Sequence, residues 1–132
     1  MTVNNVDIYI LEPDDLFRKI IYRTIKDIKM DAQINIYTYA DGYEFIRDVK
    51  GVDNFALYIV NDILPKKNGL EVAGHIRSFD NKSIIYFMTR SETEEDMLYA
   101  LNLGVDNYFV KPLNLKLFQS IIKNRIIRGG LA

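Results

Sequence analysis

The residues of this chain that could do chemistry stand directly after short apolar runs. They are, in chain order, Glu12, Pro13, Asp14, Asn61, Asp62, Thr89, Arg90 and Lys111. In an open sheet of parallel strands, ligands bind outside the carboxyl ends of the strands, near the point where the strand order reverses. The candidate functional site therefore lies at that edge of the predicted sheet.

Five apolar runs alternate with segments of helical spacing. The runs are Val6 to Leu11, Ile34 to Tyr37, Ala56 to Val60, Ile84 to Met88 and Tyr108 to Val110. The third and fourth are continuously apolar, as expected of central strands that are buried on both faces. The alternation predicts an α/β fold, with a parallel sheet covered by helices on both faces.

The segments between these runs each predict one helix with one buried face. The predicted buried residues are Leu16 or Phe17, Ile20, Ile21, Ile25 and Ile28, then Phe45, Ile46 and Val49, then Leu70, Ala73 and Ile76, then Met97, Leu98 and Leu101, then Phe118, Ile121, Ile122 and Ile126. Helix-start signals accompany two of the segments. Pro13 stands at a predicted first-turn position beside Asp14 and Asp15, and Ser91 with Glu94 forms a capping box.

The length of 132 residues and the hydrophobic content of 48% suit a single domain with one buried core. We expect this domain over residues 1–128, with a tail or the start of a linker over residues 129–132. The formal net charge of -1 gives no electrostatic reason to expect nucleic acid or a membrane as partner. No apolar run has membrane-spanning length and no signal peptide is recognisable, so a cytoplasmic protein is expected.

Several kinds of site are excluded by residue type. Cysteine is absent, which rules out disulfides and cysteine-based metal or redox sites. The single histidine, His75, cannot build a histidine cluster around a metal, and it is predicted to face solvent from a helix. Two basic groups are predicted to be solvated surface rather than phosphate-binding patches. They are Lys66 with Lys67, and Lys123 with Arg125 and Arg128.

Five stretches, in order and at matching spacing, resemble the receiver domain of bacterial response regulators over nearly the whole chain. They are Ile8 to Ile21, Thr38 to Gly42, Ile59 to Val72, Ile84 to Arg90 and Leu101 to Pro112. The resemblance implies the flavodoxin-like (CheY-like) three-layer sandwich, a five-stranded parallel sheet of order 2-1-3-4-5 with two helices on one face and three on the other.

The resemblance also implies roles for particular positions. In that family an acidic pair after the first strand holds Mg²⁺, and an aspartate ending the third strand takes a phosphoryl group from a histidine kinase. A hydroxyl after the fourth strand and a lysine after the fifth bind the phosphoryl oxygens. By position, Thr89 matches the hydroxyl and Lys111 the lysine, while Tyr108 matches the aromatic residue whose rotamer reports the switch.

Two positions depart from the family pattern. Spacing back from Pro65 and Gly69 places Asn61 at the phosphoacceptor position, and Pro13 follows Glu12 where the second acid of the pair is expected. A carboxamide is a poor nucleophile, and the developing charge of phosphoryl transfer needs a cation beside it. Proline offers such a cation no side-chain oxygen.

The oxygens left for a metal are those of Glu12, the Asn61 amide and the Ile63 carbonyl. Mg²⁺ prefers a near-octahedral shell of hard oxygen ligands, so we expect weak or absent Mg²⁺ binding and no other cofactor. Lys111, without an acceptor carboxylate, still needs a partner for its ammonium group, which Glu12, Asp14 or the Asn61 amide oxygen could supply.

Two alternatives remain at the site. Asp62 could act as acceptor if the strand register slipped by one residue, although a slip would reverse the burial of every residue in the strand. Asp14 could replace the missing metal ligand, but it and Asp15 also suit the first turn of a helix, where the macrodipole favours acids.

These observations favour a pseudo-receiver, a non-enzymatic signalling module of the two-component type that acts by protein contact without aspartyl phosphorylation. Its partner would be a histidine kinase, an output domain or a second copy. The resemblance implies contact through the face of the fourth helix, fifth strand and fifth helix, with candidates Met97, Leu98, Tyr108, Phe118 and Ile122, some of them core. Ile121 stands where dimerising members commonly place an arginine, which puts that pairing in doubt. The alternatives are a phosphorylatable receiver using Asp62 and the regulatory domain of a DNA-binding transcription factor.

Overall fold

The computed structural model describes residues 5–90 and 93–129. Five parallel strands form one sheet in the order β2-β1-β3-β4-β5. The strands are β1 (Asn5–Leu11), β2 (Gln33–Tyr39), β3 (Phe55–Asn61), β4 (Ile84–Thr89) and β5 (Asn107–Val110). Each strand contains one predicted apolar run and extends it by one or two residues at one or both ends. The predicted sheet order is confirmed.

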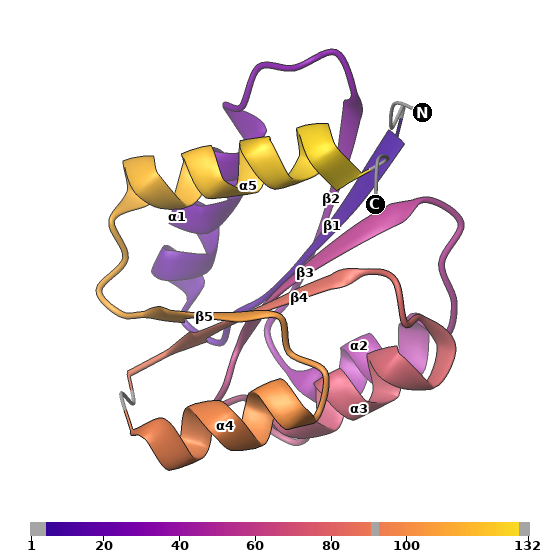
Figure 1. The fold of residues 1–132 in the computed structure, drawn as a ribbon, viewed down its shortest axis with the longest axis vertical. Coiled ribbons are helices and arrows are strands. Elements are labelled where there is room, and N and C mark those ends of the chain that lie inside the picture. The colour runs from indigo at the N-terminus through magenta and orange to yellow at the C-terminus, as the bar shows by residue number, and fades with distance from the viewer. Residues whose placement is uncertain (1–4, 91–92, 130–132) are drawn as a thin grey trace.

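Five helices connect the strands. They are α1 (Asp15–Lys26), α2 (Gly42–Asp48), α3 (Gly69–Phe79), α4 (Glu94–Asn102) and α5 (Leu115–Gly129). Figure 1 shows α1 and α5 on one face of the sheet and α2, α3 and α4 on the other. The chain is therefore a three-layer sandwich with the predicted division of its helices.

Each face of the sheet has its own apolar core, because successive residues of a strand point to opposite faces. In β3, Leu57 and Ile59 belong to the core that includes residues of α1 and α5. Tyr58 and Val60 belong to the core beneath α2 and α3. From Ala56 to Asn61 every residue of β3 is buried, as is all of β4, which confirms both as central strands.

The helix starts differ from the prediction by a few residues. Pro13 lies outside α1, because the N-cap is Asp14, whose carboxylate accepts a hydrogen bond from the Phe17 amide at 2.8 Å. Ser91 lies outside the described residues. The N-cap of α4 is Thr93, so the predicted capping box at Ser91 is wrong. The Thr93 hydroxyl, closer to the apolar segment, accepts a hydrogen bond from the Asp96 amide and so satisfies one of the first free amides of that helix.

Of the two alternatives for the buried face of α1, the structure selects Phe17, which packs against the core, while Leu16 is 70% exposed. The predicted buried face of α4 needs correction. In α4, Leu98 and Leu101 are exposed, and the one fully buried residue of the helix is Ala100. Ala100 packs in the apolar core on this face of the sheet, and the larger side chains beside it are left in solvent.

His75 is half-buried rather than facing solvent, which corrects the prediction. Its Nε2 atom lies 2.6 Å from the Val49 carbonyl oxygen, and its ring makes edge contacts with Phe45 and Phe79. The imidazole therefore ties α3 to the end of α2.

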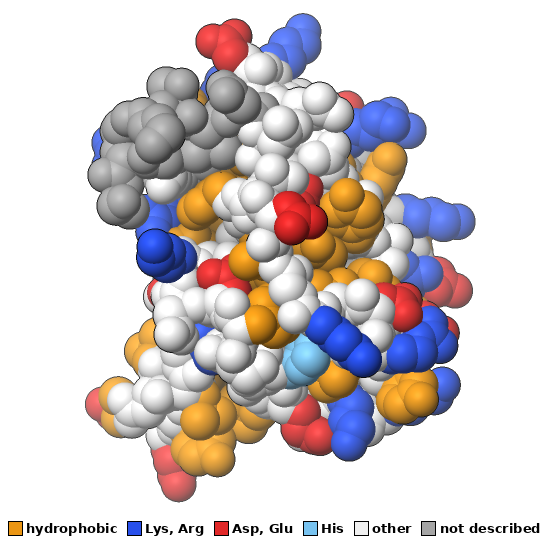
Figure 2. All heavy atoms as spheres, turned by 90° about the vertical axis from the view of Figure 1, so that its right-hand side faces the viewer, with side chains coloured by type: hydrophobic (Ala, Val, Ile, Leu, Met, Phe, Trp, Pro, Cys, Tyr) orange, Lys and Arg blue, Asp and Glu red, His pale blue; other side chains and the backbone are white. Residues whose placement is uncertain are grey.

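The surface seen in Figure 2 carries acidic and basic side chains interspersed with apolar ones, without an extended area of one charge. That pattern agrees with the near-zero net charge of the chain. In the described part of the chain, no helix combines the length and apolar character needed to cross a membrane.

Candidate functional site

A cavity of about 290 Å³ opens at the carboxyl ends of the strands, at the predicted edge of the sheet. It is lined by Glu12, Pro13, Asp14, Asn61, Asp62, Ile63, Arg90 and Lys111. The fold thus brings most of the predicted site residues together from β1, β3 and the loops after β4 and β5. Thr89 and Tyr108 do not line this cavity, but the Thr89 hydroxyl donates a hydrogen bond to Asp62, which does.

Glu12 and Lys111 form a buried ion pair in this cavity. The Lys111 ammonium donates to the Glu12 carboxylate at 2.7 Å, and the two side chains are 12% and 2% exposed, respectively. The other carboxylate oxygen accepts from the Asp14 amide at 3.0 Å. The ammonium also lies 4.7 Å from the centre of the Phe17 ring, a cation–π contact. Of the three partners considered for Lys111, the structure selects Glu12.

Asn61 turns its amide toward the chain that follows it. Its side-chain NH₂ group donates to the Ile63 carbonyl oxygen at 2.7 Å. The Asn61 side chain is buried, while that of Ile63 is 75% exposed. Two of the three remaining candidate metal ligands are therefore bonded to each other.

Asp62 reaches the site without a slip of the strand. Asn61 is the last residue of β3 and pairs with Met88, and the Asp62 amide continues the ladder to the Met88 carbonyl. One Asp62 oxygen accepts from the Thr89 hydroxyl at 2.6 Å and the other accepts from the Ile63 amide. The expectation that Asp62 needs a one-residue slip of the strand to reach the site is therefore wrong, because its carboxylate meets Thr89 in the predicted register.

Asp14 and Asp15 serve the helix start. Asp14 caps α1, and Asp15 in its first turn forms an ion pair with Arg18 at 2.6 Å. Arg18 also donates to the Glu12 carbonyl oxygen at 2.8 Å, which fixes the chain between β1 and α1. This role of Arg18 has no signal in the sequence, because the acceptor is a backbone atom.

Tyr108 lies beside α4 rather than in the cavity. Its hydroxyl donates to the Asp96 carbonyl oxygen at 3.0 Å, and its ring makes an edge contact with Phe87. Burial raises the pKa of the Tyr108 phenol, and the charges of Asp62 and Asp96 raise it further. The side chain stays neutral near pH 7 and can donate this hydrogen bond.

A second, larger cavity of about 530 Å³ adjoins the first. It is lined by Asp14, Phe17, Ile20, Arg90, Lys111, Pro112, Leu113 and Leu115. Asp14, Arg90 and Lys111 line both cavities. The apolar wall of this second cavity was not predicted, because Phe17 and Ile20 were assigned to the core from their helical spacing.

The donor set of the first cavity is a poor match for Mg²⁺. The described residues contain no group of three or more acidic or histidine side chains placed to hold a metal. Glu12 is neutralised by Lys111, and the Ile63 carbonyl is bonded to Asn61. The other two carboxylates of the cavity, those of Asp14 and Asp62, already accept hydrogen bonds from the Phe17 amide and the Thr89 hydroxyl. A hard divalent cation would therefore have to displace existing contacts in order to gain its oxygen ligands.

The fold and the site define a receiver-type signalling domain. The model of the response regulator receiver domain family matches residues 8–123, and the chain belongs to this family. Aerobic respiration control protein ArcA of Escherichia coli K12 is 32% identical over 91 residues, which cover 69% of this chain and 37% of ArcA.

Transcriptional regulatory protein CitB of Klebsiella pneumoniae is 25% identical over 121 residues, which cover 92% of this chain and 50% of CitB. The chain thus spans half or less of the length of these two relatives. Among solved structures, a two-component response regulator from Clostridium difficile matches with a TM-score of 0.80 and 25% identity, over 93% of this chain and 96% of that one.

Proposed function

We propose that this receiver domain is a pseudo-receiver, which signals by protein contact without aspartyl phosphorylation and with weak or absent Mg²⁺ binding. The observation that carries the proposal is the internal pairing of the site. Lys111 is bound to Glu12, and the Asn61 amide is bound to the Ile63 carbonyl. The groups that would hold a metal and a phosphoryl group in a working receiver are already satisfied by one another.

The chemistry of the phosphoacceptor position supports the same proposal. Phosphoryl transfer to a side chain needs an anionic oxygen as nucleophile and a cation to balance the charge of the transition state. Asn61 supplies a neutral amide, and Pro13 supplies no oxygen to the metal position. Restoring the reaction requires a change at both positions, because each supplies a different component.

Partner contact is proposed through α4. Three of its large apolar side chains are exposed, at 52%, 58% and 44%. They are Leu98, Tyr99 and Leu101, and we call them the α4 surface. Phe118 and Ile122, considered earlier as contact residues, are buried in the core and are withdrawn, while Met97 and Tyr108 are half-buried.

The partner is proposed to be a protein of a two-component pathway, either a histidine kinase or an output domain, or else a second copy of this chain. The names of ArcA and CitB describe control and transcriptional regulatory proteins. A role in regulating transcription, through an output domain of its own or of a partner, is proposed on that basis. Direct nucleic-acid or membrane binding by this domain is not proposed.

The test is exposure to a small phosphodonor. The protein is incubated with acetyl phosphate and Mg²⁺ and its intact mass is measured. No phosphoryl adduct is expected, and the double variant Pro13→Asp with Asn61→Asp should gain one. Asn61→Asp alone is expected to stay unlabelled, because the metal position remains empty of oxygen ligands. A Mg²⁺-dependent adduct on the unchanged protein would overturn the proposal.

A second candidate function is phosphorylation on Asp62. It is supported by the contact of 2.6 Å between its carboxylate and the Thr89 hydroxyl, the group that matches the family's phosphate-binding hydroxyl. In that case acetyl phosphate would label the unchanged protein, and Asp62→Asn would abolish the adduct while Asp48→Asn, at an exposed ion pair, would not.

A further inference from the structure

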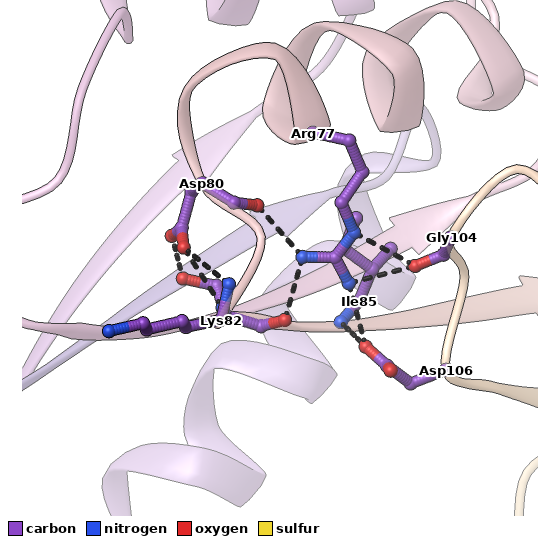
Figure 3. Close-up of polar contacts among 7 residues, drawn as sticks. Arg77, Asp80, Lys82, Ile85, Gly104 and Asp106 are labelled. Atoms are coloured by element: carbon purple, nitrogen blue, oxygen red, sulfur yellow. Dashed lines mark hydrogen bonds and ion pairs between the residues drawn. The ribbon is translucent and has the colours of Figure 1, made fainter.

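The last turn of α3 and the turn between α4 and β5 are joined by one arginine side chain. Figure 3 shows Arg77 pointing from α3 toward backbone carbonyl oxygens. These oxygens belong to the connection between α3 and β4 and to the turn before β5. We call this group the Arg77 clasp. Its members are Arg77, Asp80, Ser83, Gly104 and Asp106.

All five N–H donors of the Arg77 guanidinium are used. Its Nε and one Nη2 hydrogen donate to the Gly104 carbonyl oxygen at 3.0 and 2.8 Å. Nη1 donates to the carbonyl oxygens of Asp80 and Ser83 at 2.9 and 2.8 Å. Nη2 also donates to the Asp106 carboxylate at 2.9 Å. A lysine could not repeat this pattern, because its ammonium group has three donors and no planar fork.

Asp106 extends the clasp into the sheet. The carboxylate oxygen that accepts from Arg77 also accepts from the Ile85 amide at 2.8 Å. The Asp106 amide donates to the Ile85 carbonyl at 2.8 Å. The turn after α4 is thus fixed to α3 through Arg77 and to the start of β4 through Asp106.

The backbone conformation at Gly104 and the lack of space beside it both suit a residue without a side chain. Its φ of +103° lies in a region that side chains rarely adopt. A Cβ atom at this position would lie 3.0 Å from both the Cγ and the Nε of Arg77. The turn therefore brings its backbone directly against the arginine.

The rest of α4 buries little apolar surface. The helix fully buries only Ala100, and the α4 surface is exposed. On its first turns, the Tyr108 hydroxyl holds the Asp96 carbonyl at 3.0 Å. The C-terminal end of α4 is thus bound through a saturated guanidinium, and the Tyr108 phenol contacts its first turn from β5.

We propose that Arg77 is a positioning residue for α4. The clasp fixes the C-terminal end of the helix against α3 and the start of β4. Because the clasp lies away from the phosphoacceptor position, it sets the resting orientation of α4 without any phosphate. The functional meaning of this device rests on the proposed contact function of the α4 surface, but the device itself can be tested without a partner.

The test compares Arg77→Lys with the matched control Arg47→Lys, whose arginine forms an exposed ion pair with Asp48. Amide hydrogen exchange of the whole chain is followed by NMR. In Arg77→Lys, the amides of Val105 and Asp106 should exchange at least about tenfold faster, while strand amides of β1 keep their rates. In the control, neither set should change.

A second measurement separates positioning from simple stabilisation. Residual dipolar couplings of the α4 amides report the orientation of the helix relative to the sheet, and they should change in Arg77→Lys but not in Arg47→Lys. If Arg77→Lys does not fold, Asp106→Asn removes one arm of the clasp and should give the same changes at smaller size. Tyr108→Phe should speed exchange in the first half of α4 and leave Val105 and Asp106 protected.

Two results would overturn the inference. One is equal acceleration of β1 and α4–β5 amides in Arg77→Lys, which would mean a global loss of stability. The other is unchanged couplings in α4 once the clasp is broken. Neither result bears on phosphorylation, which the acetyl phosphate experiment tests separately.

Discussion

At the carboxyl edge of the sheet, charged and polar side chains are buried and bonded to each other, whereas on α4 apolar side chains stand in solvent. The side chains of Glu12 and Lys111 are only 2% and 12% exposed, so water reaches little of either charged group. Leu98 and Leu101 leave about half of their surface uncovered. In soluble proteins, buried polar groups are normally paired and large exposed apolar groups often mark a contact.

The two regions correspond to two parts of a receiver domain: the site where phosphate chemistry takes place in the family, and a surface that could contact a partner. The site retains the lysine and the hydroxyl of a receiver, but the lysine is used for an internal bond. The α4 surface has no such internal partner in the described residues. On the proposed function, such a domain has its fixed part where a receiver is normally switched and its accessible part where a partner would bind.

The largest expected effect comes from breaking the buried ion pair. Glu12→Gln leaves the Lys111 ammonium buried without its counter-charge, which should lower the free energy of unfolding by about 3 to 5 kcal/mol. Chemical denaturation followed by circular dichroism measures this loss. The double variant Glu12→Gln with Lys111→Met should lose clearly less than the sum of the two single variants.

The matched control is Asp48→Asn, which breaks the exposed ion pair with Arg47. Its cost should be far smaller than that of Glu12→Gln, because exposed pairs contribute little. Equal losses in Glu12→Gln and Asp48→Asn would remove the contrast between a tightly paired site and an ordinary surface.

The next effect concerns the fixed end of α4. Gly104→Ala combines an unfavourable positive φ with a methyl group placed against Arg77, and should cost about 1 to 3 kcal/mol. Thermal unfolding measures it. Gly51→Ala is a suitable control, since no atom lies within 4 Å of a methyl group at that position. The same loss in both variants would show that the turn is not specially fitted.

A smaller effect is expected on metal affinity. Pro13→Asp together with Asn61→Asp adds two carboxylates to the cavity and should raise Mg²⁺ affinity at least about tenfold, equal to about 1.4 kcal/mol. Backbone amide shifts near Glu12 and Ile63, followed during Mg²⁺ titration, measure the affinity. Saturation of the unchanged protein below about 1 mM would contradict the weak binding proposed here.

The smallest effect is expected on the α4 surface. Leu98→Ala with Leu101→Ala should change the free energy of unfolding by no more than about 0.5 kcal/mol per residue, because neither side chain is buried. Ala100→Asp, one position away, should cost about 3 kcal/mol or more by burying an unpaired charge. Comparable losses in the two would mean that the α4 surface supports the fold rather than a partner.

The strands and their order follow from the sequence because the signals are local and strong. Val60 and its neighbours form an uninterrupted apolar run, which suits only a strand with both faces covered. The burial of α4 does not follow in the same way. Leu98 and Leu101 have the spacing of a buried face, but β5 has only four residues and offers α4 little surface. The helix contributes Ala100 to the core, and so small a side chain does not stand out among large apolar residues at helical spacing.

At the site, residue identity was predictable and pairing was not. The spacing before Pro65 identifies the position of Asn61, but its hydrogen bond to a backbone carbonyl leaves no sequence pattern. Lys111 had three possible partners, and its choice of Glu12 depends on a contact across 99 positions of the chain. The Arg77 clasp was missed for a related reason, since four of its five bonds end on backbone oxygens.

The bond between Glu12 and Lys111 also bears on how this domain can evolve. Pro13→Asp alone adds an acid beside a pair that is already neutral, and Asn61→Asp alone adds a nucleophile that has no metal to assist it. On the proposed function, neither substitution alone would restore phosphoryl transfer, so the chain would need both changes to gain that chemistry. We expect descendants of this chain to diversify by changing the residues that meet their partners, while the ion pair is inherited unchanged.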